Sequence, residues 1–328
     1  MLNQIIAPTV PAAGAELMPE STDNIWEGLL NLIERAFLQL HPDLAEAAAT
    51  SLTLIGLILL VSIAVQIPGV KLKTVEMIGT VMIGTVLLQS TNSLIRLGTS
   101  TIEELSAYGE LLLPVMTSAL AAQGGLSSSA ALYAGTAFFN MLLTNLLTGL
   151  VNPMVYVFLV LSIANGALGE ELLKKMAGFI KWLSVWILKT VLYVFTGYMS
   201  LTGVISGTAD AAALKAAKLT ISGMVPVVGG ILSDASETML VSAGMIRNAA
   251  GIYGIFAVLA VFLMPFLRIG CHYLIMKVTG AVCSVFGMKR CTALISDFSG
   301  AMGLLLAMTG SVCLVQLIST VCFLRGVG

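Results

Sequence analysis

Long apolar runs, most of them without strict alternation of apolar and polar positions, fill the chain from about residue 50 to its end. They cover about 50 to 68, 75 to 95, 130 to 150, 153 to 168, 179 to 206, 250 to 267, 270 to 287 and 292 to 324. A membrane-spanning helix needs about 20 predominantly apolar residues, and only helices and closed barrels satisfy their backbone groups in lipid. The pattern therefore predicts an all-α, polytopic integral membrane protein with about seven or eight transmembrane helices.

The N-terminal part has a different pattern. Residues 1–24 contain three prolines and no basic residue, so they lack the charged start of a signal peptide and predict a disordered tail, as processing or truncation would leave. Residues 25–47 place Trp26, Ile33 and Phe37 near helical spacing, which predicts an amphipathic helix on the membrane surface. Residues 48–328 are then the transmembrane domain.

Two segments are too broken for simple spans. Residues 109–130 mix a short apolar run with Pro114, two glycines and three serines, and Pro226, Gly229 and Gly230 interrupt residues 219–232. Proline and glycine end or kink helices, and a break at membrane depth must be buried in protein or line water. We expect re-entrant hairpins or discontinuous helices at both places, with a tight turn outside the membrane as the alternative.

The two broken segments also align with each other. A shift of 112 positions lays residues 113–120 on 225–232, Pro114 on Pro226, and Pro153 on Pro265. The alignment predicts an internal duplication with repeat units at about 105–215 and 217–328. Matching Gly/Pro-interrupted segments in two halves of a membrane protein point to a substrate or ion pathway, whereas a partly chance alignment is the alternative.

Composition and charge exclude several classes of function. The 328 residues are 58% hydrophobic and 10% charged, the net charge is -1, and the mean hydropathy is +0.99, so no basic excess indicates a nucleic-acid partner. Lys71 and Lys73 in one short loop, and Lys174 and Lys175 in another, favour the cytoplasm, which predicts an extracytoplasmic N-terminus. The five cysteines lack CxxC spacing and are expected to be buried thiols, with no metal site.

Asp234 and Glu237 are the candidate chemistry beside the second break. They lie three residues apart and would share one helix face, where intramembrane carboxylates could bind a cation or relay protons. The alternative is a capping box, with Asp234 as the N-cap and Glu237 at the third helical position. Arg268 and His272 lie beside an apolar run, where the common explanation is snorkelling to the interface.

Other polar residues favour packing over catalysis. Asn140, Asn145 and Asn152 could line a polar seam or make hydrogen bonds between helices. The chain contains no HExxH, P-loop or G-x-S-x-G motif, so we expect a protein that is not an enzyme and has no cofactor.

The segment "PVVGGILSDASE" (226–237), followed by "GIYG" (251–254) and "MPFLR" (264–268), strongly resembles the stage III sporulation protein AE family of endospore-forming bacteria. The likeness covers most of the chain from about residue 50. Members of that family usually begin with a cleavable signal sequence, which this chain lacks. This departure fits a trimmed N-terminus that lies outside the cytoplasm.

The resemblance implies a multipass subunit of the channel-like complex in the mother-cell membrane around the forespore. Its implied partners are the lipid bilayer, the sibling stage III proteins that form rings, indirectly the stage II sporulation protein Q, and a secretion-type ATPase on the cytoplasmic side. The alternatives are a self-sufficient secondary transporter with its site at the duplicated broken segments, and a structural anchor for the ring proteins.

Overall fold

The computed structural model describes residues 9–18, 25–67, 72–224 and 229–325, with side chains placed for most of these but not for 202–244. Within these ranges every regular element is a helix, which confirms the all-α class. The elements are α2 (Ala12–Ala15), α3 (Ile25–Gln39), α4 (His41–Val65), α5 (Leu72–Ala122), α6 (Leu126–Leu146), the π-helical turn η1 (Leu147–Val151), α7 (Asn152–Leu168), α8 (Glu171–Met224), α9 (Gly229–Ser284) and α10 (Lys289–Arg325).

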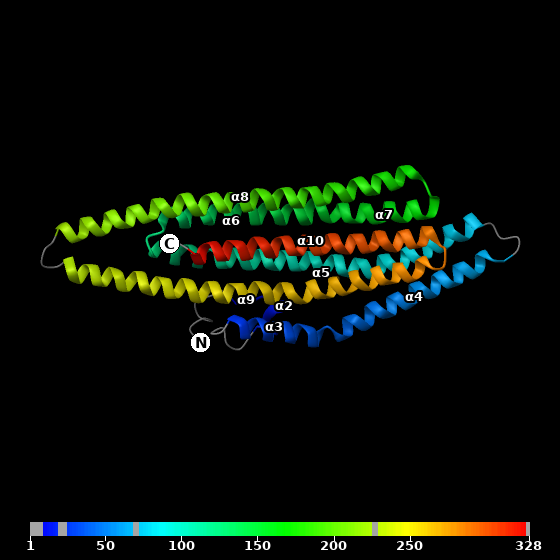
Figure 1. Ribbon diagram of the computed structural model, residues 1–328, viewed down its shortest axis with the longest axis horizontal. Coiled ribbons are helices and arrows are strands. Elements are labelled where there is room, and N and C mark those ends of the chain that lie inside the picture. Colours follow the sequence, from blue (N-terminus) through cyan, green and yellow to red (C-terminus); the bar gives the residue numbers. More distant parts are fainter. Residues whose placement is uncertain (1–8, 19–24, 68–71, 225–228, 326–328) are drawn as a thin grey trace.

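The long helices run side by side along one axis of an elongated bundle (Figure 1). Helices α5 and α10 occupy the middle of this view, α6, α7 and α8 lie above them, and α9, α3 and α4 lie below. At 1.5 Å per residue, the 51 residues of α5 extend about 76 Å, more than twice the thickness of a bilayer's hydrocarbon core. The bundle is therefore longer than one membrane crossing requires.

Six helical segments among the described residues are long and apolar enough to cross a membrane, where the sequence predicted seven or eight. The difference arises because runs predicted as separate crossings join into longer helices. The runs at 130 to 150 and 153 to 168 form one segment, Leu126–Leu168, and the runs on either side of Arg268 both belong to α9. Helices α6 and α7 are joined by η1, a π-helical turn that continues the helical path up to Pro153.

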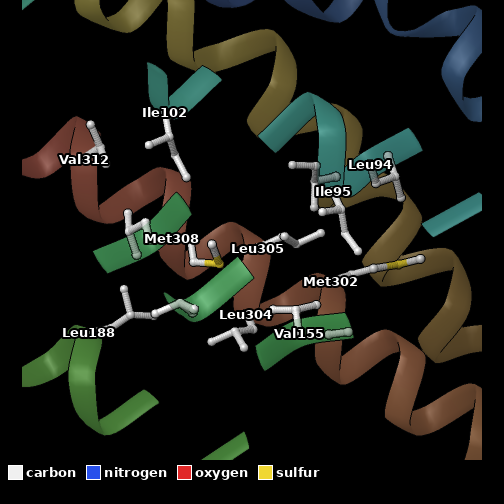
Figure 2. Close-up of a cluster of buried hydrophobic side chains, with 14 of the residues drawn as sticks. Leu94, Ile95, Ile102, Val155, Leu188, Met302, Leu304, Leu305, Met308 and Val312 are labelled. Atoms are coloured by element: carbon white, nitrogen blue, oxygen red, sulfur yellow. The ribbon is translucent and has the colours of Figure 1, made fainter. Parts of the chain in front are cut away.

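The centre of the bundle is closely packed (Figure 2). Leu305 and Met308 of α10 lie against side chains of the surrounding helices and are almost fully buried. The cluster also includes Leu94, Ile95 and Ile102 of α5, Val155 of α7, Leu188 of α8, and Met302, Leu304 and Val312 of α10. Since lipid tails are as apolar as these side chains, close packing rather than the hydrophobic effect holds the helices together here.

Glycines allow the helices to approach and turn. A Cβ atom at Gly79 of α5 would lie 2.6 Å from a methyl group of Val61 in α4, so a larger residue would push the two helices apart. Gly169 and Gly287 both have a φ of 74° at the turns before α8 and α10. Only glycine adopts this left-handed conformation without strain, so these two residues close the hairpins.

The amphipathic helix predicted for residues 25–47 has different bounds. Helix α3 ends at Gln39 and α4 begins at His41, with Pro42 in the first turn, where its missing amide removes no helical hydrogen bond. The buried face of α3 contributes Leu32 and Ala36 to a small cluster with Phe256 of α9. Its opposite face exposes Trp26, Leu30 and Phe37.

Candidate functional site

The predicted break at residues 219–232 coincides with the junction of the two longest helices. Helix α8 ends at Met224 and α9 begins at Gly229, while Pro226 falls outside the described residues. Gly230 is the second residue of α9. Because α9 starts five residues before Asp234, its backbone places Asp234 inside the helix and not at the N-cap. The side chains of Asp234 and Glu237 lie outside the described part, so their role stays a prediction.

Pro114, the partner of Pro226 in the predicted duplication, does not break a helix. It lies inside α5 with an exposed side chain, and the helix continues for two more turns to Ala122. The chain turns instead at Gly124, where φ is 90°. Pro153 and Pro265 also differ from each other, because Pro153 lies at the start of α7 whereas Pro265 lies inside α9. The duplication stays a prediction about the sequence.

The most unusual surface of the molecule is the outward face of α5. Its first part exposes apolar residues such as Ile78 and Met82, as expected for contact with lipid. From Thr85 onward the exposed residues on the same face are mostly polar: Thr85, Gln89, Asn92, Ser93, Arg96, Ser100, Glu103, Glu110 and Ser118. These nine residues, which we call the polar face of α5, recur at intervals of mostly three and four and so form one stripe. Lipid cannot hydrogen-bond the amides and charged groups of Gln89, Asn92, Arg96, Glu103 and Glu110, so this stripe faces water or protein.

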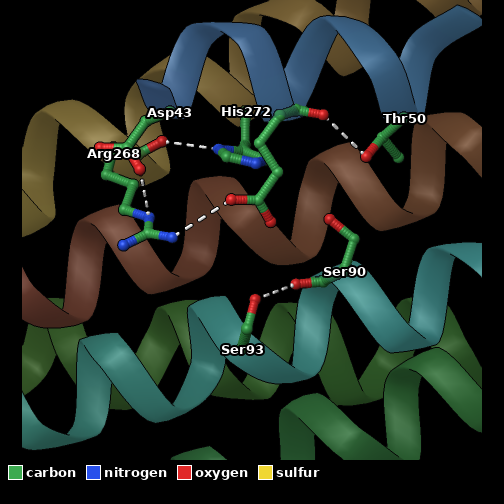
Figure 3. A network of polar contacts seen from close by, with 7 residues as sticks. Asp43, Thr50, Ser90, Ser93, Arg268 and His272 are labelled. Atoms are coloured by element: carbon green, nitrogen blue, oxygen red, sulfur yellow. Dashed lines mark hydrogen bonds and ion pairs between the residues drawn. The ribbon is translucent and has the colours of Figure 1, made fainter. Parts of the chain in front are cut away.

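A groove lies beside the polar face of α5, between α4 and α5. It is a cavity of about 530 Å³, lined by Glu46, Ala49, Thr50 and Thr53 of α4 and by Val86, Gln89, Ser90 and Ser93 of α5. Several hydroxyls donate back to their own helix, for example Thr50 to the Glu46 carbonyl at 3.0 Å and Ser93 to the Ser90 carbonyl at 2.8 Å (Figure 3). Their oxygens can still accept hydrogen bonds from water.

An ion-pair cluster shares Glu46 with this groove and joins α4 to α9 (Figure 3). The Arg268 guanidinium lies 3.0 Å from Asp43 Oδ1 and 3.3 Å from Glu46 Oε2. Asp43 is only 8% exposed, and His272, 1% exposed, places its Nδ1 3.0 Å from the Arg268 carbonyl. Arg268 therefore pairs with the acids of α4, an arrangement that the snorkelling interpretation did not include.

The polar seam predicted at the asparagines is a network between helices. Asn140 donates to Ser106 Oγ at 2.9 Å and accepts from Gln316 Nε2 at 2.8 Å, which connects α6 to α5 and α10. Asn152 donates to Thr99 Oγ1 at 3.2 Å, while Asn145 is exposed. The space beside Gln316 is only about 10 Å³, too small for a passage. This network stabilises the packing of the bundle.

The described residues contain no group of three or more His, Cys, Asp or Glu side chains that could hold a metal ion. The five cysteines are free thiols, three of them buried and two half-buried. The surface that sequence reasoning missed is the polar face of α5. Its signal is the spacing of polar residues from Thr85 to Ser118, but the apolar run predicted at 75 to 95 ended just before Arg96, so the continuation of the helix was not expected.

Comparison with known proteins gives a match over nearly the whole chain. The family model described as stage III sporulation protein AE matches residues 20–325. The stage III sporulation protein AE of Bacillus subtilis (strain 168) is 23% identical over 200 residues, which cover 61% of this chain and 50% of that protein, so the match spans about half the length of the relative. No solved structure matches the chain.

Proposed function

The chain belongs to the stage III sporulation protein AE family, and from this premise we propose that it is a multipass subunit, without enzymatic activity, of the complex that connects mother cell and forespore during sporulation. In this proposal it resides in the mother-cell membrane and contributes one wall of a route across it. Its partners are other stage III sporulation proteins, indirectly the stage II sporulation protein Q, and a secretion-type ATPase.

One contrast carries the proposal: polar residues gather on the surface of the bundle, whereas the centre is packed with apolar side chains. Leu305, Met308 and their neighbours fill the axis on which a pore through a single chain would lie. The polar face of α5 and the groove beside Glu46 are open to the outside. A surface of this kind in a membrane protein needs water or a polar partner, which supports a route formed between subunits.

Charge supports the proposed orientation. Basic residues gather at the end where α5, α8 and α10 begin, namely Lys73, Lys174, Lys175, Lys289 and Arg290. Short connections rich in lysine and arginine favour the cytoplasm, so this end is cytoplasmic in the proposal. Helix α4 ends at this side after a single crossing, and the segment before it, including α3, then lies toward the extracytoplasmic side.

Labelling of single cysteines with a membrane-impermeant maleimide tests the proposed route. In sporulating cells of the host bacterium, a Ser93→Cys variant is expected to react at least about tenfold faster than a Trp186→Cys variant, because thiolates form and react in water and not in lipid. The unsubstituted chain provides the background from the native thiols. Equal and slow labelling at both positions would show that the polar face of α5 does not contact water.

Reconstitution separates a subunit from a self-sufficient transporter. Liposomes that contain this chain alone are expected to retain an enclosed fluorescent solute, because the centre of the bundle is packed. Solute release by the purified chain alone would overturn the proposal in favour of a transporter. Retention in these liposomes, together with co-purification of the chain with other stage III proteins from sporulating cells, would support the subunit.

A further inference from the structure

A second polar cavity lies at the basic end of the bundle. It has a volume of about 300 Å³ and forms where α7 ends and α8 and α10 begin. This volume is at the lower end of the range for ligand pockets, about 300–1,000 Å³. The lining side chains that can interact with a ligand are Ser162, Asn165, Glu171, Lys174, Lys289, Arg290 and Asp297.

One of the basic residues, Arg290, is held in place. Its Nε lies 3.5 Å from Glu76 Oε2, and its Nη1 donates to the Ala167 carbonyl at 3.5 Å. The guanidinium lies directly over Gly169, where an added Cβ would come within 2.6 Å of Nη2. Arg290 therefore forms a fixed wall of the cavity, with its charge already paired.

The two lysines of the cavity are available to a ligand. Neither Lys174 nor Lys289 makes an ion pair with any residue that the structure describes, and both side chains are exposed. Lys289 is the first residue of α10, and Lys174 lies in the first turn of α8. The first amides of a helix lack partners within the helix and carry a partial positive charge, so two helix ends add to the positive potential of the cavity.

The floor of the cavity contains a buried polar group without a partner. Ser162 is 1% exposed, and its Oγ makes no hydrogen bond of good geometry among the described residues. An unpaired hydroxyl in the interior costs free energy unless a water or ligand satisfies it. The Asp297 carboxylate lies within reach of the Ser162 hydroxyl, and the ammonium groups of Lys174 and Lys181 lie near it. The cavity thus combines hydrogen-bonding groups at its floor with exposed lysines at its mouth.

We propose that this cavity binds a phosphate-bearing anion at the basic end of the bundle. The phosphate contacts Lys174, Lys289 and the first amides of α10, as phosphates do at helix N-termini. Ser162 and Asp297 hydrogen-bond a hydroxyl of the ligand that reaches the floor. Two kinds of ligand have this chemistry: the head group of an anionic phospholipid and a soluble phosphate ester. Basic pockets between transmembrane helices bind such head groups on the cytoplasmic side.

Binding to the purified full chain in lipid nanodiscs tests the proposal and separates the two sources. Native mass spectrometry would count phosphatidylglycerol retained from mixed phosphatidylglycerol and phosphatidylcholine nanodiscs. Glycerol 3-phosphate and inorganic phosphate would be added to nanodiscs of phosphatidylcholine alone. Retention of phosphatidylglycerol over phosphatidylcholine identifies a lipid head group, and saturable binding of glycerol 3-phosphate or inorganic phosphate identifies a soluble ligand.

A matched pair of double variants links the binding to this cavity. The double variant Lys174→Gln/Lys289→Gln is expected to weaken the binding of the retained anion about thirtyfold. The control Lys175→Gln/Lys189→Gln makes the same change of charge at exposed positions outside the cavity and is expected to leave binding unchanged. Ser162→Ala, which keeps all charges, is expected to weaken binding severalfold. Equal loss in both double variants, or no preference for any of the anions, would overturn the proposal.

Discussion

Helices α5 and α8 are similar in length, with 51 and 54 residues, and they belong to the same bundle, yet their outward faces differ in chemistry. The polar face of α5 extends from Thr85 to Ser118. Over its first half, α8 instead exposes large apolar side chains, which we call the aromatic face of α8: Leu172, Met176, Phe179, Trp182, Trp186, Tyr193, Val194 and Leu201. Phe179, Trp182 and Trp186 lie in sequence with ring centroids 5.9 and 6.4 Å apart.

The difference shows which surface lipid can cover. Lipid tails can cover the aromatic face of α8, where hydrogen-bonding groups are few, whereas the polar face of α5 requires water or a polar partner. Length alone does not distinguish the two helices, because both are more than twice as long as the hydrocarbon core of a bilayer is thick. The chemistry of the exposed face therefore indicates function better than the count of crossings does.

The largest expected effect comes from making α5 resemble α8. A Gln89→Leu/Ser93→Leu/Ser100→Leu variant replaces three exposed polar residues of α5 by apolar ones and is expected to lower the count of heat-resistant spores by about tenfold or more, because an apolar constriction in an aqueous route excludes water. Immunoblotting of membranes would establish that the variant accumulates normally.

The matched control makes a change of similar size on α8. Trp182→Leu/Trp186→Leu/Tyr193→Leu keeps that face apolar and is expected to leave spore counts unchanged. If the α8 variant lost spores while the α5 variant retained them, the assignment of the two faces would be reversed.

The next effect concerns the ion pairs beside the groove. Arg268→Met leaves the buried Asp43 carboxylate without its cation and is expected to lower the free energy of unfolding by about 2 kcal/mol, less than for a fully buried pair because the Arg268 side chain is 36% exposed. Denaturant unfolding in detergent micelles measures this change. Lys277→Met removes an exposed positive charge from the same helix and serves as the control. A similar loss in both variants would mean that the pair with Asp43 contributes nothing.

The sequence allowed some of these elements to be predicted and not others, for physical reasons. The runs at 50 to 68 and 292 to 324 correspond to α4 and α10, since each is bounded by polar residues that lie near helix ends. The predicted runs ended at about 95 and 267, next to Arg96 and Arg268, because a charge beside an apolar run indicates the end of a membrane span when nothing is known about its neighbours. In the structure, Arg268 is paired with α4, and Arg96 belongs to a polar face.

The candidate site depended even more on three-dimensional contacts. Pro114 could not be distinguished from a true helix break, because a helix tolerates proline where packing by its neighbours holds the chain in place. The groove and the cavity at the basic end are formed by residues distant in sequence, such as Glu46 with Gln89, or Ser162 with Lys289. The spacing of polar residues along α5 was visible in the sequence, but it became informative only once residues 72–122 were known to form one helix.

A smaller effect is expected inside the bundle, where polar groups pair between helices. Gln316→Leu removes the donor to Asn140 and is expected to lower the free energy of unfolding by about 1 kcal/mol. A hydrogen bond between membrane helices contributes about 0.6 kcal/mol on average, and the substitution also leaves the side-chain carbonyl of Asn140 buried without this donor. A double-mutant cycle with Asn140→Leu, again by unfolding in micelles, isolates the coupling. A coupling near zero would show that the two amides do not depend on each other.

The smallest expected effect tests the aromatic face of α8 itself. Trp186 is 52% exposed, and its ring contacts mainly Trp182 of the same helix, so Trp186→Leu is expected to change the free energy of unfolding in micelles by less than about 0.5 kcal/mol. Leucine keeps the surface apolar and removes only the ring stacking. A loss well above this value would mean that the aromatic face is covered by protein and not by lipid. Helices α5 and α8 would then both be interfaces with partner subunits, one polar and one apolar.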